Sequence, residues 1–133
     1  MTRPVPTQPE VTRRVLLIDD EELIREVAEV SLAKVGGWEV LTASSGEEGL
    51  HMAVGEHPDA ILLDVMMPGL DGPGTLARLR ADPATATIPV VFLTAKVRQS
   101  EQQQWIDLGA AGVLVKPFDP MSLANQVAEV LGW

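Results

Sequence analysis

Five short apolar runs recur about 25 residues apart along the sequence, and helix-like patterns fill the intervals between them. The runs occupy residues 15–18, 39–42, 60–63, 90–93 and 113–115. Most are apolar throughout and do not alternate with polar residues, as is typical of strands covered on both faces. Strands that alternate with helices in this way form a parallel α/β sheet. The pattern therefore predicts an α/β fold and excludes a β-sandwich and a helical bundle.

Signals for helices fall between these runs. An apolar stripe after the first run comprises Leu23, Ile24, Val27, Ala28, Ser31 and Val35, and Gly36-Gly37 ends it. Ser45 and Glu48 have the spacing of a capping box for a second helix. Asp71 can cap a third helix, which directs Leu76 and Leu79 inward.

Two further helices are expected toward the end of the chain. The fourth covers residues 100–108 and stops at Gly109. The fifth has Asp119 as its N-cap and Pro120 at its first helical position. Its apolar face carries Leu123, Val127 and Leu131.

Composition indicates one globular domain. The chain has 133 residues, enough for a buried core, and 46% of them are hydrophobic. We expect a flexible, proline-containing tail over residues 1–13 and one domain over residues 14–133, with no linker and no second domain. The formal net charge of −9 repels phosphate backbones, so direct nucleic-acid binding is not expected.

The sequence also bears on the cellular compartment. No apolar stretch approaches the roughly 20 residues that a membrane helix needs. The N-terminus has no apolar segment typical of a secretory signal. Cysteine is absent, which excludes a disulfide framework and a thiolate site. We therefore expect no membrane partner and a cytoplasmic localisation.

Four of the five apolar runs end in polar side chains that can handle a phosphoryl group. Asp19-Asp20 follow the first run, Asp64 the third, Thr94 the fourth and Lys116 the fifth. Because ligands bind beyond the carboxyl ends of strands in an open parallel sheet, these side chains should meet there. The sequence predicts a site with three carboxylates, one hydroxyl and one ammonium.

The balance of charge at this edge predicts a metal ion. Carboxylates about 4 Å apart repel by roughly 4 kcal/mol at an effective dielectric constant of 20. Lys116 offsets one of the three negative charges, and a divalent cation balances the rest. A partly hydrated site with oxygen ligands suits Mg²⁺. Asp64 can then act as the nucleophile toward a phosphoryl group, with Lys116 and Thr94 each contacting one of its oxygens.

Five motifs stand in order along the sequence around these residues. They are Asp19-Asp20, Asp64 with Met67-Pro68-Gly69, Asp71-Gly72, Thr94-Ala95, and Lys116-Pro117-Phe118. Together they resemble the receiver domain of bacterial two-component response regulators, and the resemblance covers residues 14–133. It implies a flavodoxin-like (βα)5 three-layer sandwich with the parallel strand order 2-1-3-4-5.

The resemblance also assigns roles to the acidic residues. It implies that Asp64 is the phosphoacceptor, that Asp20 binds Mg²⁺ directly and that Asp19 binds it mainly through water. The backbone carbonyl of Met66 is implied as a further metal ligand.

The function that the resemblance implies is signalling without enzymatic turnover. Asp64 accepts the phosphoryl group from a phosphohistidine on a sensor histidine kinase or a histidine phosphotransfer protein. Thr94 and Lys116 contact the phosphoryl oxygens, and the Lys116–Pro117 peptide is expected to be cis. The fourth helix, fifth strand and fifth helix form the usual surface for a downstream protein or a homodimer. Alternatively, the phosphoryl group is passed on in a phosphorelay.

The sequence departs from the family at Val113, where Tyr or Phe usually acts as a rotamer switch. We expect signalling through Thr94 and loop movement instead. Met66 and Lys96 stand at positions that tune the attack of water on the phosphoaspartate, and the apolar Met66 predicts a long-lived phosphoryl state. Gly72-Pro73-Gly74 has no functional explanation in the sequence.

Three other interpretations of these motifs fit the sequence less well. Residues 72–77 match a dinucleotide-binding pattern, but a seven-residue loop follows Asp64 and the acidic partner is missing. A haloacid-dehalogenase-type phosphatase needs an acid/base two residues after the nucleophile, where Met66 cannot transfer a proton. A receiver-like module that works without phosphorylation typically lacks one of the acidic pair, the acceptor or the lysine, and this chain has all of them.

Overall fold

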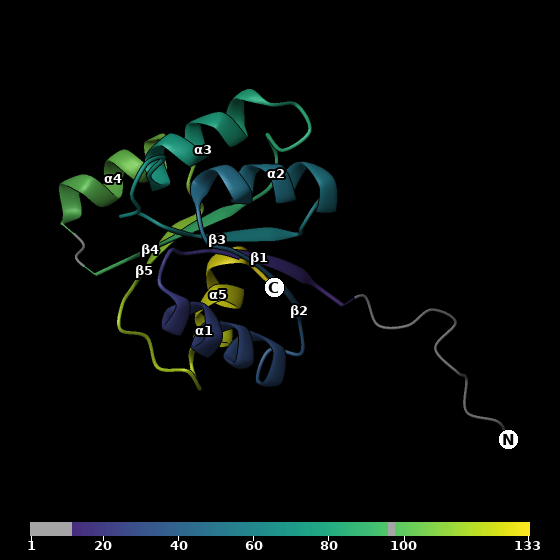
Figure 1. Cartoon of the computed structure of the whole chain (residues 1–133). Helices are drawn as coiled ribbons and strands as arrows, with labels where there is room; N and C mark the ends of the chain where they lie inside the picture. The colour runs from purple at the N-terminus through teal and green to yellow at the C-terminus, as the bar shows by residue number, and fades with distance from the viewer. Residues whose placement is uncertain (1–11, 96–97) are drawn as a thin grey trace, which may run out of the picture.

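A computed structural model describes residues 12–95 and 98–133 of the chain (Figure 1). Strands and helices alternate in the order β1 (Arg14–Ile18), α1 (Glu22–Lys34), β2 (Glu39–Ala43), α2 (Gly46–Glu56), β3 (Ala60–Asp64), α3 (Gly72–Ala81), β4 (Val90–Thr94), α4 (Gln99–Asp107), β5 (Gly112–Val115) and α5 (Leu123–Leu131). The strand pairs of the described residues are all parallel, in the order β2-β1-β3-β4-β5. The predicted α/β fold and its strand order are confirmed.

Helices cover both faces of the sheet, which gives the molecule three layers (Figure 1). α1 and α5 lie on one face, and α2, α3 and α4 lie on the other. Because successive side chains in a strand point to opposite faces, each strand contributes to both cores. In β1, Leu16 and Ile18 pack on the α2–α4 side, and Val15 and Leu17 pack on the α1–α5 side. None of the helices in the described residues has the length and apolar character needed to cross a membrane.

The strand register brings the polar strand ends to one edge of the sheet. Ile18 pairs with Leu63, Leu63 pairs with Phe92, and Thr94 pairs with Val115. Because the strands are parallel, their carboxyl ends lie side by side. The polar residues at or just beyond the ends of β1, β3, β4 and β5 therefore share this edge.

The predicted helix ends are confirmed at three places. The Ser45 hydroxyl accepts a hydrogen bond from the Glu48 N–H at 3.1 Å, which caps α2. The Asp71 carboxylate accepts one from the Gly74 N–H at 2.8 Å, and α3 then directs both of its leucines into the core. α4 stops just before Gly109, whose φ of 108° is readily adopted by glycine.

The predicted inward stripe of α1 is partly wrong. Ala28, Ser31 and Leu32 are the buried residues of this helix, whereas Leu23 is 69% exposed and Val35 is 40% exposed. Leu23 lies five residues before Ala28, which places it about 140° around the helix and away from the sheet. Val35 comes after the last helical residue and is only partly covered.

α5 begins at Leu123, three residues later than predicted. The predicted N-cap is wrong, because the N-cap residue of α5 is Ser122 and not Asp119. The Asp119 carboxylate instead accepts hydrogen bonds from the Met121 N–H at 2.9 Å and the Ser122 hydroxyl at 3.2 Å. The Asp119 carbonyl, however, accepts the Ser122 N–H at 2.9 Å, which is the i to i+3 spacing of a turn. Residues 120–122 therefore form a tight turn that precedes the helix.

Residues 1–11 of the predicted tail, and Lys96, lie outside the described residues. Arg13, which the sequence placed in the tail, lies with its guanidinium carbon 4.5 Å from the ring centroid of Trp133. Trp133 in turn packs edge-on against Trp38 at a centroid distance of 5.1 Å. Arg13 before β1 and Trp38 before β2 thus both contact Trp133, the last residue of the sequence.

Arg80 connects α3 to two loops through hydrogen bonds of its side chain. Its guanidinium donates hydrogen bonds to the carbonyls of Ala86 at 3.2 Å, Ile88 at 2.9 Å and Gly109 at 3.0 Å. These bonds join α3 to the loop that precedes β4 and to the turn that follows α4. The backbone that leads into both β4 and β5 therefore depends on one side chain.

We expect Arg80→Ala to lower the free energy of unfolding by about 2–4 kcal/mol, because three carbonyls lose a charged donor. Arg78, which is exposed on the same helix, provides a matched control. Arg78→Ala should change the free energy by less than about 0.5 kcal/mol. Urea denaturation measures both values, and an equal loss in the two variants would contradict the role assigned to Arg80.

Candidate functional site

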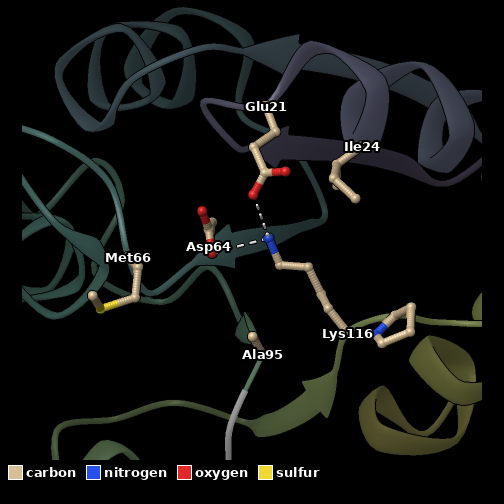
Figure 2. Close-up of a pocket in the computed structure, with 7 residues that line it drawn as sticks. Glu21, Ile24, Asp64, Met66, Ala95 and Lys116 are labelled. Atoms are coloured by element: carbon tan, nitrogen blue, oxygen red, sulfur yellow. Dashed lines mark ion pairs between the residues drawn. The ribbon is translucent and has the colours of Figure 1, made fainter.

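The candidate site is a pocket of about 260 Å³ at the carboxyl edge of the sheet (Figure 2). Its walls are formed by Glu21, Ile24, Asp64, Met66, Ala95, Lys116 and Pro117. These residues come from the start of α1, the ends of β3 and β4, and the segment that follows β5. The sheet topology thus brings together Asp64 and Lys116, which are far apart in the sequence.

The Lys116 ammonium is the centre of this site. Its Nζ lies 2.9 Å from Oδ2 of Asp19, 3.2 Å from Oδ1 of Asp64 and 3.9 Å from Oε1 of Glu21. Figure 2 shows the lysine side chain reaching from below into the space between Glu21 and Asp64. The side chain of Lys116 is 10% exposed, and that of Asp19 is fully buried. Because little water screens these charges, they interact strongly.

The same surroundings shift the pKa values of two groups. Burial, together with the charge of Asp19, raises the pKa of Asp64 to about 6, although Lys116 and a backbone hydrogen bond from Met66 act in the opposite direction. Burial lowers the pKa of Lys116, but hydrogen bonds and charge from Asp19 and Asp64 outweigh this and raise it above its ordinary value. Lys116 therefore stays charged at neutral pH, where Asp64 is mostly ionised.

Asp19 is held from several directions. Its Oδ2 accepts a hydrogen bond from Lys116, and its Oδ1 accepts the Glu21 N–H at 2.9 Å. Its main-chain carbonyl accepts a hydrogen bond from the Arg25 guanidinium at 2.8 Å. Both carboxylate oxygens are thus engaged within the protein, which fixes this side chain beneath the pocket.

The acidic residues supply a donor set for a divalent cation. Carboxylate oxygens of Asp19, Asp20 and Glu21 lie within 4.8 Å of one another. Asp19 is buried, whereas Asp20 and Glu21 are exposed and leave room for water. Carboxylates combined with water suit Mg²⁺, so the residues present fit the predicted metal. Asp64 and the backbone carbonyl of Met66 remain predicted ligands.

Glu21 is the member of the site that the sequence reasoning missed. The available signal was the uninterrupted acidic run Asp19-Asp20-Glu21, of which the predicted site includes only the first two residues. Glu21 is the N-cap residue of α1, but its side chain makes no capping hydrogen bond and lines the pocket instead. This fourth carboxylate adds to the negative charge that Lys116 alone does not balance.

A second pocket of about 480 Å³ adjoins the first. Its walls are formed by Val65, Met66, Thr94, Ala95, Arg98, Glu101 and Trp105, so Met66 and Ala95 line both pockets. Thr94 is 4% exposed and belongs to the walls of this second pocket. Thr94, which was predicted for the site, therefore lies at the end of β4, next to β3. It lines the pocket that adjoins the one lined by Asp64 and Lys116.

The corner around Thr94 takes its aromatic side chains from β4 and α4. Val113 on β5 is partly buried and packs against the core on the α2–α4 side of the sheet. Trp105 of α4 packs edge-on against Phe92, with ring centroids 5.5 Å apart. Trp105 is 7% exposed and shares the second pocket with Thr94. The Lys116–Pro117 peptide beyond β5 is cis, as predicted.

Gly72 has a structural explanation that the sequence did not provide. It is the first residue of α3, and its N–H donates a hydrogen bond to the Val65 carbonyl at 2.9 Å. A Cβ atom at this position would lie 2.6 Å from the carbonyl oxygen of Asp64 and 2.7 Å from Cα of Val65. Glycine is therefore needed so that α3 can start against the backbone at the end of β3.

Comparison with known proteins establishes the class to which this fold and site belong. The chain matches the family model of the response regulator receiver domain over residues 15–128. It therefore belongs to the receiver domain family of response regulators, and the resemblance stated from its motifs is confirmed.

Solved structures of this family are similar to the chain over nearly its whole length. Chemotaxis response regulator CheY4 of Vibrio cholerae is 32% identical with a TM-score of 0.84, covering 90% of this chain and 99% of that one. The receiver domain of sensor histidine kinase PA1611 from Pseudomonas aeruginosa is 27% identical with a TM-score of 0.80, covering 92% of this chain and 100% of that one. That receiver domain has a magnesium ion coordinated in its active-site cleft.

Curated relatives are longer proteins. The probable transcriptional regulator ycf27 of Guillardia theta is 39% identical over 122 residues, which cover 92% of this chain and 46% of the relative. The phosphate regulon transcriptional regulatory protein PhoB of Pseudomonas aeruginosa is 37% identical over 121 residues, which cover 91% and 52%. The chain thus spans about half the length of the curated relatives it matches.

The close approach at Gly72 predicts a large effect of one methyl group. We expect Gly72→Ala to lower the free energy of unfolding by about 1–3 kcal/mol, because the backbone of Asp64 and Val65 must shift. Gly55 near the end of α2 provides the control, since a Cβ there has nothing within 4 Å. Gly55→Ala should raise the free energy by about 0.5–1 kcal/mol. Thermal unfolding measures both, and an unchanged Gly72→Ala protein would refute the proposed constraint.

The raised pKa of Asp64 predicts that its charge destabilises the metal-free fold. The folded protein binds a proton at Asp64 more tightly than the unfolded chain does. Protonation of Asp64 therefore removes the destabilisation, and the free energy of unfolding rises as the pH falls through about 6. In EDTA at pH 7.5, Asp64→Asn should raise the free energy of unfolding by about 1–3 kcal/mol. The difference should narrow between pH 7 and pH 4. Urea denaturation of the parent and of Asp64→Asn from pH 7.5 to pH 4 measures this difference. If Asp64→Asn is less stable than the parent at pH 7.5, the prediction is wrong.

Proposed function

We propose that the chain accepts a phosphoryl group on Asp64 from a phosphohistidine. The donor is a sensor histidine kinase or a histidine phosphotransfer protein. The observation that carries this proposal is the buried Lys116 ammonium, which lies within 3.2 Å of both Asp19 and Asp64 beside a pocket. Burying charges costs free energy that apolar packing does not, which is why such a cluster points to chemistry.

In the proposed transfer, a carboxylate oxygen of Asp64 attacks the phosphorus atom while the bond from phosphorus to the histidine nitrogen breaks. A pKa of about 6 leaves Asp64 mostly ionised at pH 7.5 and available as the nucleophile. Lys116 keeps its charge and can move from the carboxylates to one phosphoryl oxygen. The Thr94 hydroxyl, from the neighbouring strand, contacts a second.

Asp19, Asp20, Asp64 and the backbone carbonyl of Met66 are the groups that hold Mg²⁺ in this proposal. When bound, the ion supplies positive charge that offsets the acidic cluster and the charge on the phosphoryl oxygens. The donor set described above supports this role, as does the magnesium ion in the receiver domain of the Pseudomonas aeruginosa kinase. Because Lys116 and the Glu21 N–H already engage both Asp19 oxygens, Asp19 is expected to act mainly through water.

The proposed phosphoryl transfer is confined to Asp64 of the chain itself. The domain is therefore proposed to act as a phosphoacceptor and not as an enzyme with a separate substrate. Met66 stands two residues after Asp64, where a phosphatase of the haloacid-dehalogenase type needs a proton donor. A thioether cannot serve that purpose. The remaining alternative is an interaction module that works without phosphorylation, and the complete set of Asp19, Asp64 and Lys116 disfavours it.

The signal is proposed to leave through the face formed by α4, β5 and α5. Ile106 and Leu108 at the end of α4 are 41% and 49% exposed, and Val115 at the end of β5 is 53% exposed. These exposed apolar side chains on α4 and β5 support the proposal that this face binds another protein. A downstream protein or a second copy of the chain binds there, or the phosphoryl group is passed on in a phosphorelay.

The same proposal bears on other partners and on localisation. The net charge of −9 supports the absence of direct contact between this chain and nucleic acid. A kinase-coupled receiver is expected in the cytoplasm, without a membrane partner. The longer relatives are named as transcriptional regulators, and because the chain matches only about half of their length, that activity is not carried over to it.

Incubation with acetyl phosphate and Mg²⁺, followed by intact-protein mass spectrometry, tests the proposed acceptor. We expect the mass of one phosphoryl group to be added to the parent protein and not to Asp64→Asn. Adding a chelator should prevent the gain. If a folded protein that binds Mg²⁺ gains no mass, the phosphorylation-independent module becomes the better interpretation.

A further inference from the structure

Met66 is an unusually accessible sulfur beside the acceptor. Its side chain is 77% exposed, whereas that of the adjacent Met67 is 7% exposed. It lines the pocket of Asp64 and Lys116, as Figure 2 shows, and it also lines the second pocket. The chain has no cysteine, so methionine supplies all of its sulfur.

The position of Met66 distinguishes it from Met121, the other exposed methionine among the residues that the structure describes. Met121 is 69% exposed, but it lies in the turn before α5 and lines neither pocket. Exposure alone would make the two thioethers similarly accessible to an oxidant. Only at Met66 would a change in polarity alter the pocket that a water molecule must enter to reach a phosphoryl group on Asp64.

We propose that Met66 is a modification site, at which oxidation to methionine sulfoxide shortens the lifetime of the phosphoryl group on Asp64. This inference rests on the proposed function, because it concerns the phosphorylated state. The oxidant is a hydroperoxide such as hydrogen peroxide. The receiver thereby responds to oxidising conditions without any thiol.

The oxidation step transfers one oxygen atom. The thioether sulfur attacks a peroxide oxygen, an S–O bond forms, the O–O bond breaks, and hydrogen peroxide leaves as water. Sulfur is oxidised by two electrons and the peroxide is reduced by two. The product is polar and its oxygen accepts hydrogen bonds, whereas the thioether is apolar and a weak acceptor. A methionine sulfoxide reductase reverses the change.

The consequence concerns hydrolysis of the phosphoaspartate. In that step a water oxygen bonds to phosphorus, the bond from phosphorus to the Asp64 oxygen breaks, and the water proton passes to the departing phosphate or to solvent. The thioether of Met66 offers little to orient this water. A sulfoxide oxygen in the same wall accepts a hydrogen bond from it and holds it near the phosphorus.

The test compares phosphoryl decay before and after oxidation. The protein is treated with hydrogen peroxide, modification of Met66 is verified by peptide mass mapping, and the protein is labelled with acetyl phosphate and Mg²⁺. Loss of the phosphoryl mass is then followed over time. We expect decay to become about fivefold faster, the rate equivalent of one hydrogen bond. Treatment with the reductase should restore the original rate.

Two substitutions separate Met66 from general oxidation. In Met121→Leu, which retains Met66, oxidation should still accelerate decay. In Met66→Leu, peroxide should leave the decay unchanged. Met66→Gln, which introduces a neutral polar group without oxidation, should decay faster than Met66→Leu. The inference is overturned if complete oxidation of Met66 leaves the decay rate of the parent unchanged, or if Met66→Leu responds as the parent does.

Failure of the acceptor proposal is distinguishable from failure of this inference. If the unoxidised protein gains no phosphoryl group on Asp64, the proposed function itself fails and the inference falls with it. If acetyl phosphate labels the parent protein and does not label Asp64→Asn, the rate at which the phosphoryl group is lost tests the role of Met66 alone. Thermal unfolding of the oxidised protein checks that the fold is retained, so that faster decay reports on the site.

Discussion

The site depends on one buried ammonium group that is shared between two carboxylates. Lys116 lies 2.9 Å from Asp19 and 3.2 Å from Asp64, and these three side chains are almost completely buried. Each carboxylate raises the pKa of the lysine, and the lysine partly offsets the pKa increase that burial and Asp19 cause in Asp64. Removing Lys116 would leave two buried carboxylates without a cation, which is costly, whereas removing Asp64 leaves Asp19 and Lys116 as a pair. The ends of β1, β3 and β5 are therefore linked electrostatically as well as by the sheet.

Most of this arrangement could be predicted from the sequence because parallel strands share one carboxyl edge. Once residues 60–63 are identified as a buried strand, the polar group at its end must lie beside those that end the neighbouring strands. Asp64, Thr94 and Lys116 are predicted on that basis, and the structure brings each to this edge. Apolar patterning does not specify which strands are neighbours in the sheet. The strand order could therefore be predicted only from the resemblance to receiver domains.

The details that the sequence did not predict depend on three-dimensional packing. Glu21 lines the pocket because the start of α1 lies within reach of the Lys116 side chain, which no local pattern reveals. α5 begins at Leu123 because Asp119 first caps a turn, and a cap before a turn has the same sequence signature as a cap before a helix. Gly72 is explained only by the backbone of Asp64 and Val65 that it contacts.

In the proposed function, the signal passes the corner near Thr94 without an aromatic residue at Val113 on β5. Val113 is too small to move between an inward and an outward position as a ring does. The aromatic ring that shares a pocket with Thr94 is Trp105, which belongs to α4 and rests edge-on against Phe92. A displacement of Thr94 toward a phosphoryl oxygen changes a wall of the pocket that α4 also lines. We therefore propose that the signal passes from the site to the output face through α4.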